Sequence, residues 1–329
     1  MEMNEKIRLR RLRKTDLIRQ LAAETNVNVN DLVYPIFIKE GKKIKEAITN
    51  MPNIYRYSID NLDAEIEEIK SLGIKTIILF GIPKFKNESG DGAYIKQGII
   101  QKTVRHLREV TNDLTIITDV CLCQYINHGH CGVIKNDKIL NDASLSILSK
   151  IALSHAEEGA DFVAPAAMMD HQVRTLRAGL DKENYQDTGI LSYSAKYASS
   201  LYHPFRNIAN SHPTFGDRES YQMNITNSKE ALREIDIDIQ EGADIIMVKP
   251  ALFYLDIISK AKNRFDIPIA AYNVSGEYAM IMSAVQNNLL DKNDIIFETI
   301  TSIKTAGADI IITYFAKDIV NILKNKNQV

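Results

Sequence analysis

A lysine follows an uninterrupted apolar run in the second half of the chain. Residues 245–248 are four consecutive apolar residues, which is typical of a buried strand, and Lys249 comes directly after them. An ammonium removed from water is unstable, so burial lowers the pKa of a lysine and makes its neutral amine available as a nucleophile. The alternative is a strand that reaches the surface at Lys249. The choice depends on what else gathers there.

All three cysteines of the chain fall within eleven residues. Cys121, Cys123 and Cys131 begin at the end of an apolar run and continue into a polar stretch that also holds His128 and His130. Thiolates at this spacing suit one tetrahedral Zn²⁺ ion. Three ligands leave a fourth position open, as in catalytic zinc sites, whereas a fourth ligand from either histidine would close the site. Three incidental small apolar residues are the alternative, which their clustering in a polar loop disfavours.

A repeated pattern indicates how these residues are positioned. The tripeptide Gly-Ala-Asp occurs at residues 159–161, 242–244 and 307–309, each time after a helix-like stretch and before an apolar strand, and residues 72–79 form a looser copy. Helix, glycine and strand in repetition are typical of βα units around a parallel sheet. Further strands are expected at residues 32–38, 114–120, 190–194 and 268–272. Helical patterns lie between them, for example at 61–71, 144–158, 228–241, 254–264, 278–287 and 294–306.

Eight such strands predict a (β/α)8 barrel over residues 31–329, preceded by an N-terminal arm over residues 1–30. A doubly wound open sheet is the alternative, but the glycine-rich phosphate turn that usually follows its first strand is absent from the sequence. Counting seven residues from each repeat glycine places Phe80, Ala166, Lys249 and Tyr314 at one height. That height is the carboxyl end of the strands, where barrels of this kind build their active sites.

Three more polar residues lie near expected strand ends: Asp119, Lys196 and Ser275. Two lysines, an aspartate, a serine and a tyrosine are therefore expected around one rim. Two lysines that converge in one cavity repel each other as ammonium ions, which favours the neutral amine of Lys249.

Composition excludes several classes of function. The chain has 329 residues, 45% hydrophobic and 25% charged, with a formal net charge of −2, so it gives no electrostatic case for binding nucleic acid. No apolar run approaches the ~20 residues of a membrane span, and no apolar stretch follows the first charged residues as in a secretory signal. Three cysteines in an unexported chain argue against disulfides, and we expect a cytoplasmic protein.

Several longer motifs are specific enough to indicate a family. They are SYSAKYASS at 192–200, PFR at 204–206, GDR at 216–218, YQM at 221–223, MVKP at 247–250 and VSGEYAM at 274–280. With these motifs the chain resembles the porphobilinogen synthase family, also called delta-aminolevulinic acid dehydratases, from about Arg8 to about Ala316. The resemblance implies a (β/α)8 barrel whose arm wraps a neighbouring subunit, commonly in a homo-octamer.

The resemblance also implies a lyase reaction of haem biosynthesis. Two 5-aminolevulinate molecules condense to porphobilinogen with loss of two waters. Lys249 would form a Schiff base with the substrate that becomes the propionate side, and Lys196 with the acetate-side substrate. The implied substrate contacts are Arg206 and Arg218 for the acetate-side carboxylate, Ser275 and Tyr314 for the other, and Asp119 and Gln222 along the site. The implied metal ligands are Cys121, Cys123 and Cys131 for zinc, and Glu234 for an allosteric magnesium ion.

The segment between Lys196 and Gln222 carries both arginines and is rich in Ser, Asn, Gly and Pro. We predict that it is a lid that closes over the substrates and excludes water, with a static loop as the alternative. Several positions depart from the family pattern. Ala166 and Ala167 replace a serine and an aspartate, Gln124 replaces a glutamate, and Ala251 replaces a glycine. We expect altered contacts rather than loss of the reaction.

Two other functions compete with this prediction. A class I aldolase would use one imine lysine and would need no thiolate loop, so the cysteine cluster disfavours it. A catalytically inactive zinc-binding scaffold would not need both lysines and both arginines.

Overall fold

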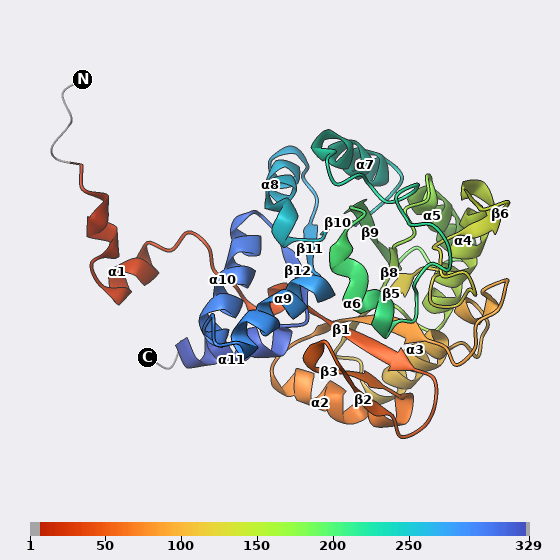
Figure 1. Cartoon of the computed structure of the whole chain (residues 1–329), viewed down its shortest axis with the longest axis horizontal. Coiled ribbons are helices and arrows are strands. Elements are labelled where there is room, and N and C mark those ends of the chain that lie inside the picture. The colour runs from red at the N-terminus through yellow and green to blue at the C-terminus, as the bar shows by residue number, and fades with distance from the viewer. Residues whose placement is uncertain (1–6, 327–329) are drawn as a thin grey trace.

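The computed structural model describes residues 7–326, with a closed barrel of eight parallel strands at its centre (Figure 1). The strands in ring order are β1 (Leu32–Lys39), β4 (Thr76–Ile82), β5 (Thr115–Val120), β8 (Phe162–Pro165), β9 (Gly189–Lys196), β10 (Ile245–Lys249), β11 (Ile269–Asn273) and β12 (Ile310–Thr313). Pairing of β12 with β1 closes the ring. The predicted (β/α)8 barrel is confirmed, and the open doubly wound sheet is excluded.

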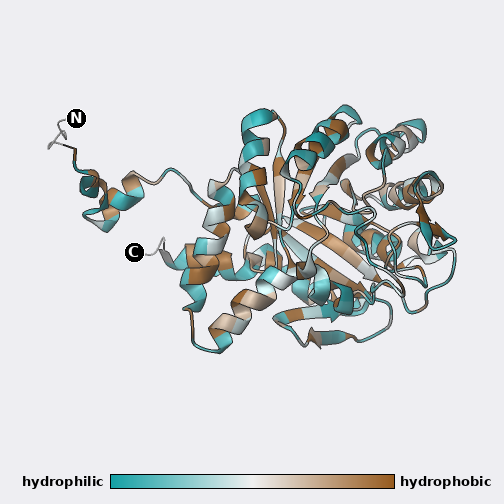
Figure 2. Cartoon of the chain, turned by 45° about the horizontal axis from the view of Figure 1, so that its top comes forward, coloured by the Kyte–Doolittle hydropathy of each residue, from teal (hydrophilic) through white to brown (hydrophobic). Residues whose placement is uncertain are grey.

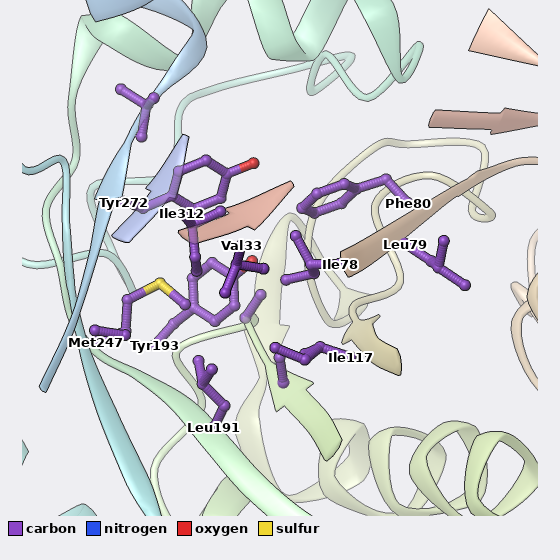
Figure 3. Packing of buried hydrophobic residues seen from close by; sticks show 14 of the residues in the cluster. Val33, Ile78, Leu79, Phe80, Ile117, Leu191, Tyr193, Met247, Tyr272 and Ile312 are labelled. Atoms are coloured by element: carbon purple, nitrogen blue, oxygen red, sulfur yellow. The ribbon is translucent and has the colours of Figure 1, made fainter. Parts of the chain in front are cut away.

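Helices cover the outside of the barrel (Figure 1). They are α2 (Asp63–Ser71), α3 (Ile99–Val110), α4 (Asn141–Glu157), α5 (Gln172–Lys182), α7 (Ser228–Gln240), α8 (Leu255–Arg264), α9 (Ser275–Gln286), α10 (Lys292–Thr305) and α11 (Ala316–Lys326). The barrel strands are largely hydrophobic, and the outer sides of the helices are largely hydrophilic (Figure 2). Side chains from different strands, among them Ile78, Tyr193 and Met247, meet in the barrel interior (Figure 3).

The Gly-Ala-Asp repeat builds junctions that fix neighbouring strands against each other. Gly242 has a φ of 101°, in the left-handed region that favours glycine, and ends the helical segment before β10. The backbone N–H of Asp244 donates to the Ile190 carbonyl (3.0 Å), and its Oδ2 accepts from the Ile190 N–H (2.7 Å). Asp161 with Ile116, and Asp309 with Ile269, repeat both bonds. The repeat therefore ties β10 to β9, β8 to β5, and β12 to β11.

A bulge between β9 and β10 brings the two lysines level. Ile245 lies opposite Leu191, but Lys249 lies opposite Lys196, so β9 contains one residue more than β10 over this stretch. Side chains alternate between the faces of a strand, and a shift of one residue reverses the face that each side chain takes. The extra residue therefore sets Lys196, rather than Ala195, beside Lys249.

Two hairpins were not expected from the sequence. β2 (Lys45–Ile48) and β3 (Met51–Tyr57) form an antiparallel hairpin, and β3 also pairs with the carboxyl end of β1. β6 (Val133–Lys135) and β7 (Lys138–Leu140) form a second hairpin after the cysteines. The lid segment, residues 197–221, carries a 3-10 helix, η5 (Ser200–Tyr202), and the helix α6 (His203–Ile208), so it is more ordered than a plain loop.

The N-terminal segment stands away from the barrel (Figure 1). Its 3-10 helix η1 (Leu9–Arg13) and its helix α1 (Asp16–Leu21) contain no buried residue, and the Leu17 and Leu21 side chains are 77% and 87% exposed. Residues 1–6 of the predicted arm and residues 327–329 of the predicted barrel lie outside the described residues. Within residues 7–326 no helix has the length and apolarity needed to cross a membrane.

We predict that Asp244→Ala lowers the free energy of unfolding by about 1–2 kcal/mol, because the Ile190 N–H loses a carboxylate acceptor. Chemical denaturation measures the loss. Asp244→Asn keeps an oxygen at this position and should retain most of the stability, and Asp187→Ala, at an exposed loop position, is the matched control. Equal midpoints for Asp244→Ala and Asp187→Ala would show that the junction bond adds nothing.

Candidate active site

A pocket lies over the carboxyl ends of the barrel strands. Its walls include all four residues that the repeat placed at one height: Phe80, Ala166, Lys249 and Tyr314. Most of the other predicted site residues line it too: Asp119, Cys121, Cys123, Lys196, Arg206, Arg218 and Ser275. The free volume is about 30 Å³, room for about two water molecules.

Lys249 is buried among aromatic rings. Its side chain is 7% exposed, and its Nζ lies 4.3 Å from the ring centre of Tyr272 and 4.7 Å from that of Tyr193. Burial, and next the positive charge of Lys196, lower its pKa to about 7. The amine is therefore substantially neutral near neutral pH, as the sequence predicted for a lysine in this position.

Lys196 is 6% exposed, and its Nζ donates a hydrogen bond to the main-chain carbonyl of Ala166. Ala166 stands where the family pattern has a serine. A backbone oxygen at this position thus holds the second lysine without a side-chain hydroxyl.

Asp119 supplies negative charge beside the two lysines. Asp119 lines the pocket. Burial raises the pKa of its carboxyl group, and the positive charges of Lys196 and Lys249 oppose that rise. Gln124 Nε2 donates to Asp119 Oδ2 at 3.1 Å, and Gln124 Oε1 lies 3.4 Å from Cys123 Sγ. Gln124, one of the departures from the family pattern, therefore links the carboxylate to the cysteines through a neutral amide.

The three cysteines form one buried cluster beside this pocket. The Sγ atoms of Cys121, Cys123 and Cys131 all lie within 4.8 Å of one another. Hydrogen bonds from Cys121 and then from Cys123 hold the pKa of Cys131 well below its usual value, so the fold favours a thiolate here. Soft sulfur donors at this spacing fit a tetrahedral metal such as Zn²⁺.

The neighbouring histidines do not complete that cluster. His130 Nδ1 lies 3.1 Å from Tyr221 Oη, and its Nε2 lies 2.9 Å from the Phe215 carbonyl. His128 Nδ1 accepts from the His130 N–H (3.1 Å). Within residues 7–326, the clustered candidate ligands are the three cysteines alone. A metal held by them would keep a free coordination position, which is the catalytic arrangement.

The two lid arginines enter the pocket with unused hydrogen-bonding capacity. Arg206 lies on α6 and Arg218 in the later part of the lid, and the buried Nε of each has no hydrogen-bond partner. Arg218 also donates to the carbonyls of Gly129 (2.9 Å) and Ser211. Burial lowers the pKa of Arg206, an effect that an anionic ligand would offset.

The remaining predicted residues occupy different places. Ser275 Oγ accepts from the Phe205 N–H of the lid (3.0 Å), and Tyr314 Oη lies 3.1 Å from Tyr272 Oη, both in the pocket. Gln222 and Glu234 line a neighbouring, larger cavity instead. Both side-chain polar atoms of Gln222 are buried without a partner. Burial, then Asp238 and Asp170, raise the pKa of Glu234 to about 7.

The aromatic enclosure of Lys249 was not predicted. Its members come from β9, the lid and β11: Tyr193, Tyr202, Phe205 and Tyr272. A sequence signal existed in β9, because Tyr193 and Lys196 lie in the same SYSAK motif. Rings that approach from separate elements had no such signal.

The fold and pocket together define a (β/α)8-barrel enzyme. The family model described as delta-aminolevulinic acid dehydratase matches residues 6–322. Relatives described by that name from Methanothermus sociabilis and Bacillus subtilis are 58% and 47% identical, over 95% and 94% of this chain and 97% and 96% of their own. The crystal structure of the Toxoplasma gondii enzyme with its reaction product porphobilinogen superposes with a TM-score of 0.94, at 40% identity, covering 96% of this chain and 91% of that one.

The chain belongs to the delta-aminolevulinic acid dehydratase family. Its activity is that of a porphobilinogen synthase, a lyase of tetrapyrrole biosynthesis.

We predict that wild-type stability rises relative to Lys249→Met as the pH increases from 7 to 9.5. A folded-state pKa of about 7 lies below the ordinary value of 10.5, so the unfolded chain binds more protons in this window. The difference in free energy of unfolding between wild type and Lys249→Met should increase in favour of the wild type by up to about 3 kcal/mol over this window, at ~1.4 kcal/mol per pH unit. Denaturation curves at several pH values measure this, with exposed Lys182→Met as the control. Parallel pH profiles would contradict the lowered pKa.

Proposed function

We propose that this enzyme condenses two 5-aminolevulinate molecules through Schiff bases on Lys249 and Lys196, with zinc held by the three cysteines. One observation carries the proposal. Two buried lysines lie level on adjacent strands in one pocket, and two of the clustered cysteines form part of the same wall. A single-imine aldolase has no use for the second lysine or for the thiol cluster.

The lysines act as amine nucleophiles toward the keto carbons of the substrates. A neutral Lys249 adds to the carbonyl carbon and expels water to give an imine, and its pKa of about 7 supplies the neutral form. Lys196 does the same for the second substrate, with its Nζ oriented by the Ala166 carbonyl. New C–C and C–N bonds join the two substrates, both lysines are released, and two waters are lost overall. Asp119 lies beside both amines and can take up and return their protons.

The cysteine cluster fits the metal that this reaction would use. Cys121, Cys123 and Cys131 would hold Zn²⁺, and two of them, Cys121 and Cys123, also line the pocket. When bound, zinc supplies a Lewis acid that polarises a carbonyl group or lowers the pKa of bound water.

The substrate carboxylates have matching groups in the site. Arg206 and Arg218 each hold a buried N–H without a partner, and a guanidinium suits a carboxylate. Gln222, with both amide atoms unpartnered, adds to this acetate-side clamp from the adjoining cavity. Ser275 and Tyr314 offer hydroxyl groups for the other carboxylate.

The lid would move to make room for two substrates. A free volume of about 30 Å³ does not hold two 5-aminolevulinate molecules. The lid segment forms one side of the pocket through Tyr202, Phe205, Arg206 and Arg218. Closure after binding would bring the arginines onto the substrates and exclude water.

Assembly and regulation complete the proposal. The exposed leucines of the arm over residues 1–30 fit packing on a neighbouring subunit, in a homo-octamer. Glu234 would ligate an allosteric Mg²⁺, which would relieve the repulsion among the nearby carboxylates. We propose a cytoplasmic location for the enzyme.

We predict that purified protein forms porphobilinogen from 5-aminolevulinate with zinc present, and that complete removal of zinc by a chelator lowers kcat at least tenfold, because the metal's Lewis acidity is lost. Colorimetric detection of porphobilinogen and metal analysis before and after chelation provide the measurement. Restored activity on adding zinc is the control for chelator damage. Full activity without zinc would show that the cysteine cluster is not catalytic.

We predict that borohydride with 5-aminolevulinate labels Lys249, because reduction traps the imine as a stable amine. Peptide mass spectrometry locates the label. Lys249→Ala should lose that label and should lower kcat by at least 10³-fold, whereas Lys182→Ala, at an exposed site, should change neither. A labelled lysine elsewhere, with no label at Lys249, would refute the assigned role.

A further inference from the structure

Cationic side chains hold the backbone of the lid where α6 ends. Arg56 of β3 donates through Nε to the Ile208 carbonyl (3.1 Å). Lys86 donates through Nζ to the Asn210 carbonyl, and Arg218 donates to the Ser211 carbonyl. Each of these bonds is charge-assisted and therefore stronger than a bond between neutral groups. This stretch of the lid follows directly on Arg206, the arginine that α6 presents to the pocket.

Lys86 connects the lid to the cysteine loop, residues 121–132. Its Nζ lies 3.4 Å from the main-chain carbonyl of Cys123, in addition to its bond with Asn210. Lys86 belongs to the loop after β4, so a third element joins the other two. The cation thus bridges the backbone of a candidate zinc ligand and the backbone of the lid.

Of these three cations, Lys86 is the one that bridges the cysteine loop and the lid from outside the pocket. Arg56 pairs with Glu46 of its own hairpin and reaches the lid, but it bonds to no atom of the cysteine loop. Arg218 bonds to both the loop and the lid, but it also lines the pocket, where it serves the substrate carboxylate. Lys86 bridges loop and lid without lining the pocket.

The cysteine loop and the lid also meet directly. The Thr214 N–H donates to the His128 carbonyl (3.0 Å). A Cβ at Gly129 would lie 2.1 Å from the His212 carbonyl oxygen, so the two backbones touch there. A change in the conformation of the cysteine loop would therefore alter the position of the lid through these backbone contacts.

We propose that Lys86 is a positioning residue that couples the order of the cysteine loop to closure of the lid. The proposal rests on the zinc site proposed above. Ligation of the Cys123 thiolate fixes the backbone of that residue, its carbonyl then orients the Lys86 ammonium, and the ammonium holds the Asn210 carbonyl. Lid closure over the substrates thus depends on a filled metal site. Lys86 itself touches neither the substrate nor the reacting atoms.

Hydrogen exchange of the lid tests the coupling. The reporters are the amides of Ala209, Ser211 and Thr214, which bond to Phe205, Arg206 and His128. In wild type, these amides should exchange about tenfold more slowly with saturating zinc than after chelation, a change of ~1.4 kcal/mol. In Lys86→Met this zinc effect should fall below twofold, and KM for 5-aminolevulinate should rise about tenfold, with bound zinc per chain unchanged.

Three further variants make the test specific. Lys84→Met, with the same substitution in the same loop at an exposed side chain, should behave as wild type. Lys86→Arg keeps the charge and the donors and should keep the zinc effect. Arg56→Met should speed lid exchange with and without zinc by the same factor, because Arg56 does not contact the cysteine loop.

Each result decides between the alternatives. If Lys86→Met folds with the wild-type melting temperature and retains the full zinc effect, the coupling role is wrong, whatever its activity. If Lys86→Met does not fold, the other two variants decide: loss of the zinc effect in Lys86→Arg, or its loss in Arg56→Met, overturns the coupling role. If wild type forms no porphobilinogen with zinc, the proposed function fails, while the exchange data still decide on Lys86.

Discussion

The structure depends on one costly arrangement, the placement of two buried amines at the same level on adjacent strands. Lys196 and Lys249 face each other across adjacent strands, each less than a tenth exposed. Burial of a single ammonium is already unfavourable, and two in contact repel. The bulge in β9 sets this alignment, and the Asp244 junction fixes the start of β10 against β9.

The surroundings make that arrangement tolerable without removing its reactivity. Asp119 provides a counter-charge, the Ala166 carbonyl accepts from Lys196, and aromatic faces lie against Lys249. The balance leaves the pKa of Lys249 near 7 rather than restoring its ordinary value. A strong ion pair would have stabilised the ammonium form of Lys249, and the neutral amine would then be scarce. The cysteine cluster, which favours a thiolate at Cys131, adds negative character on the same side.

Features that repeat along the chain could be predicted from the sequence. Features that depend on contacts between distant segments could not. The Gly-Ala-Asp repeat and its looser copy predicted the barrel and the meeting of Phe80 and Tyr314 in one pocket, because each copy sets a fixed spacing from a helix end to the following strand end. The sequence pattern did not contain the β2–β3 hairpin, the short lid helices or the rings around Lys249. Those depend on packing between segments far apart in the chain, as when Phe205 of the lid meets a lysine of β10. Gln222 shows the same limit: its motif was evident in the sequence, but its position in the neighbouring cavity could not be predicted.

The aspartate junctions have a mechanical consequence for the barrel. Their side chains join three pairs of strands, β5 with β8, β9 with β10 and β11 with β12. No aspartate side chain of the repeat joins one of these pairs to the next. At the seam between β8 and β9, strand pairing is limited to Phe162 with Gly189 and Val163 with Ile190, both at the amino ends of the strands. Above that point the bond from Lys196 to Ala166 crosses the seam. The Lys196 side chain thus connects β9 to the end of β8 at a height where the backbone pairing of the two strands has already stopped.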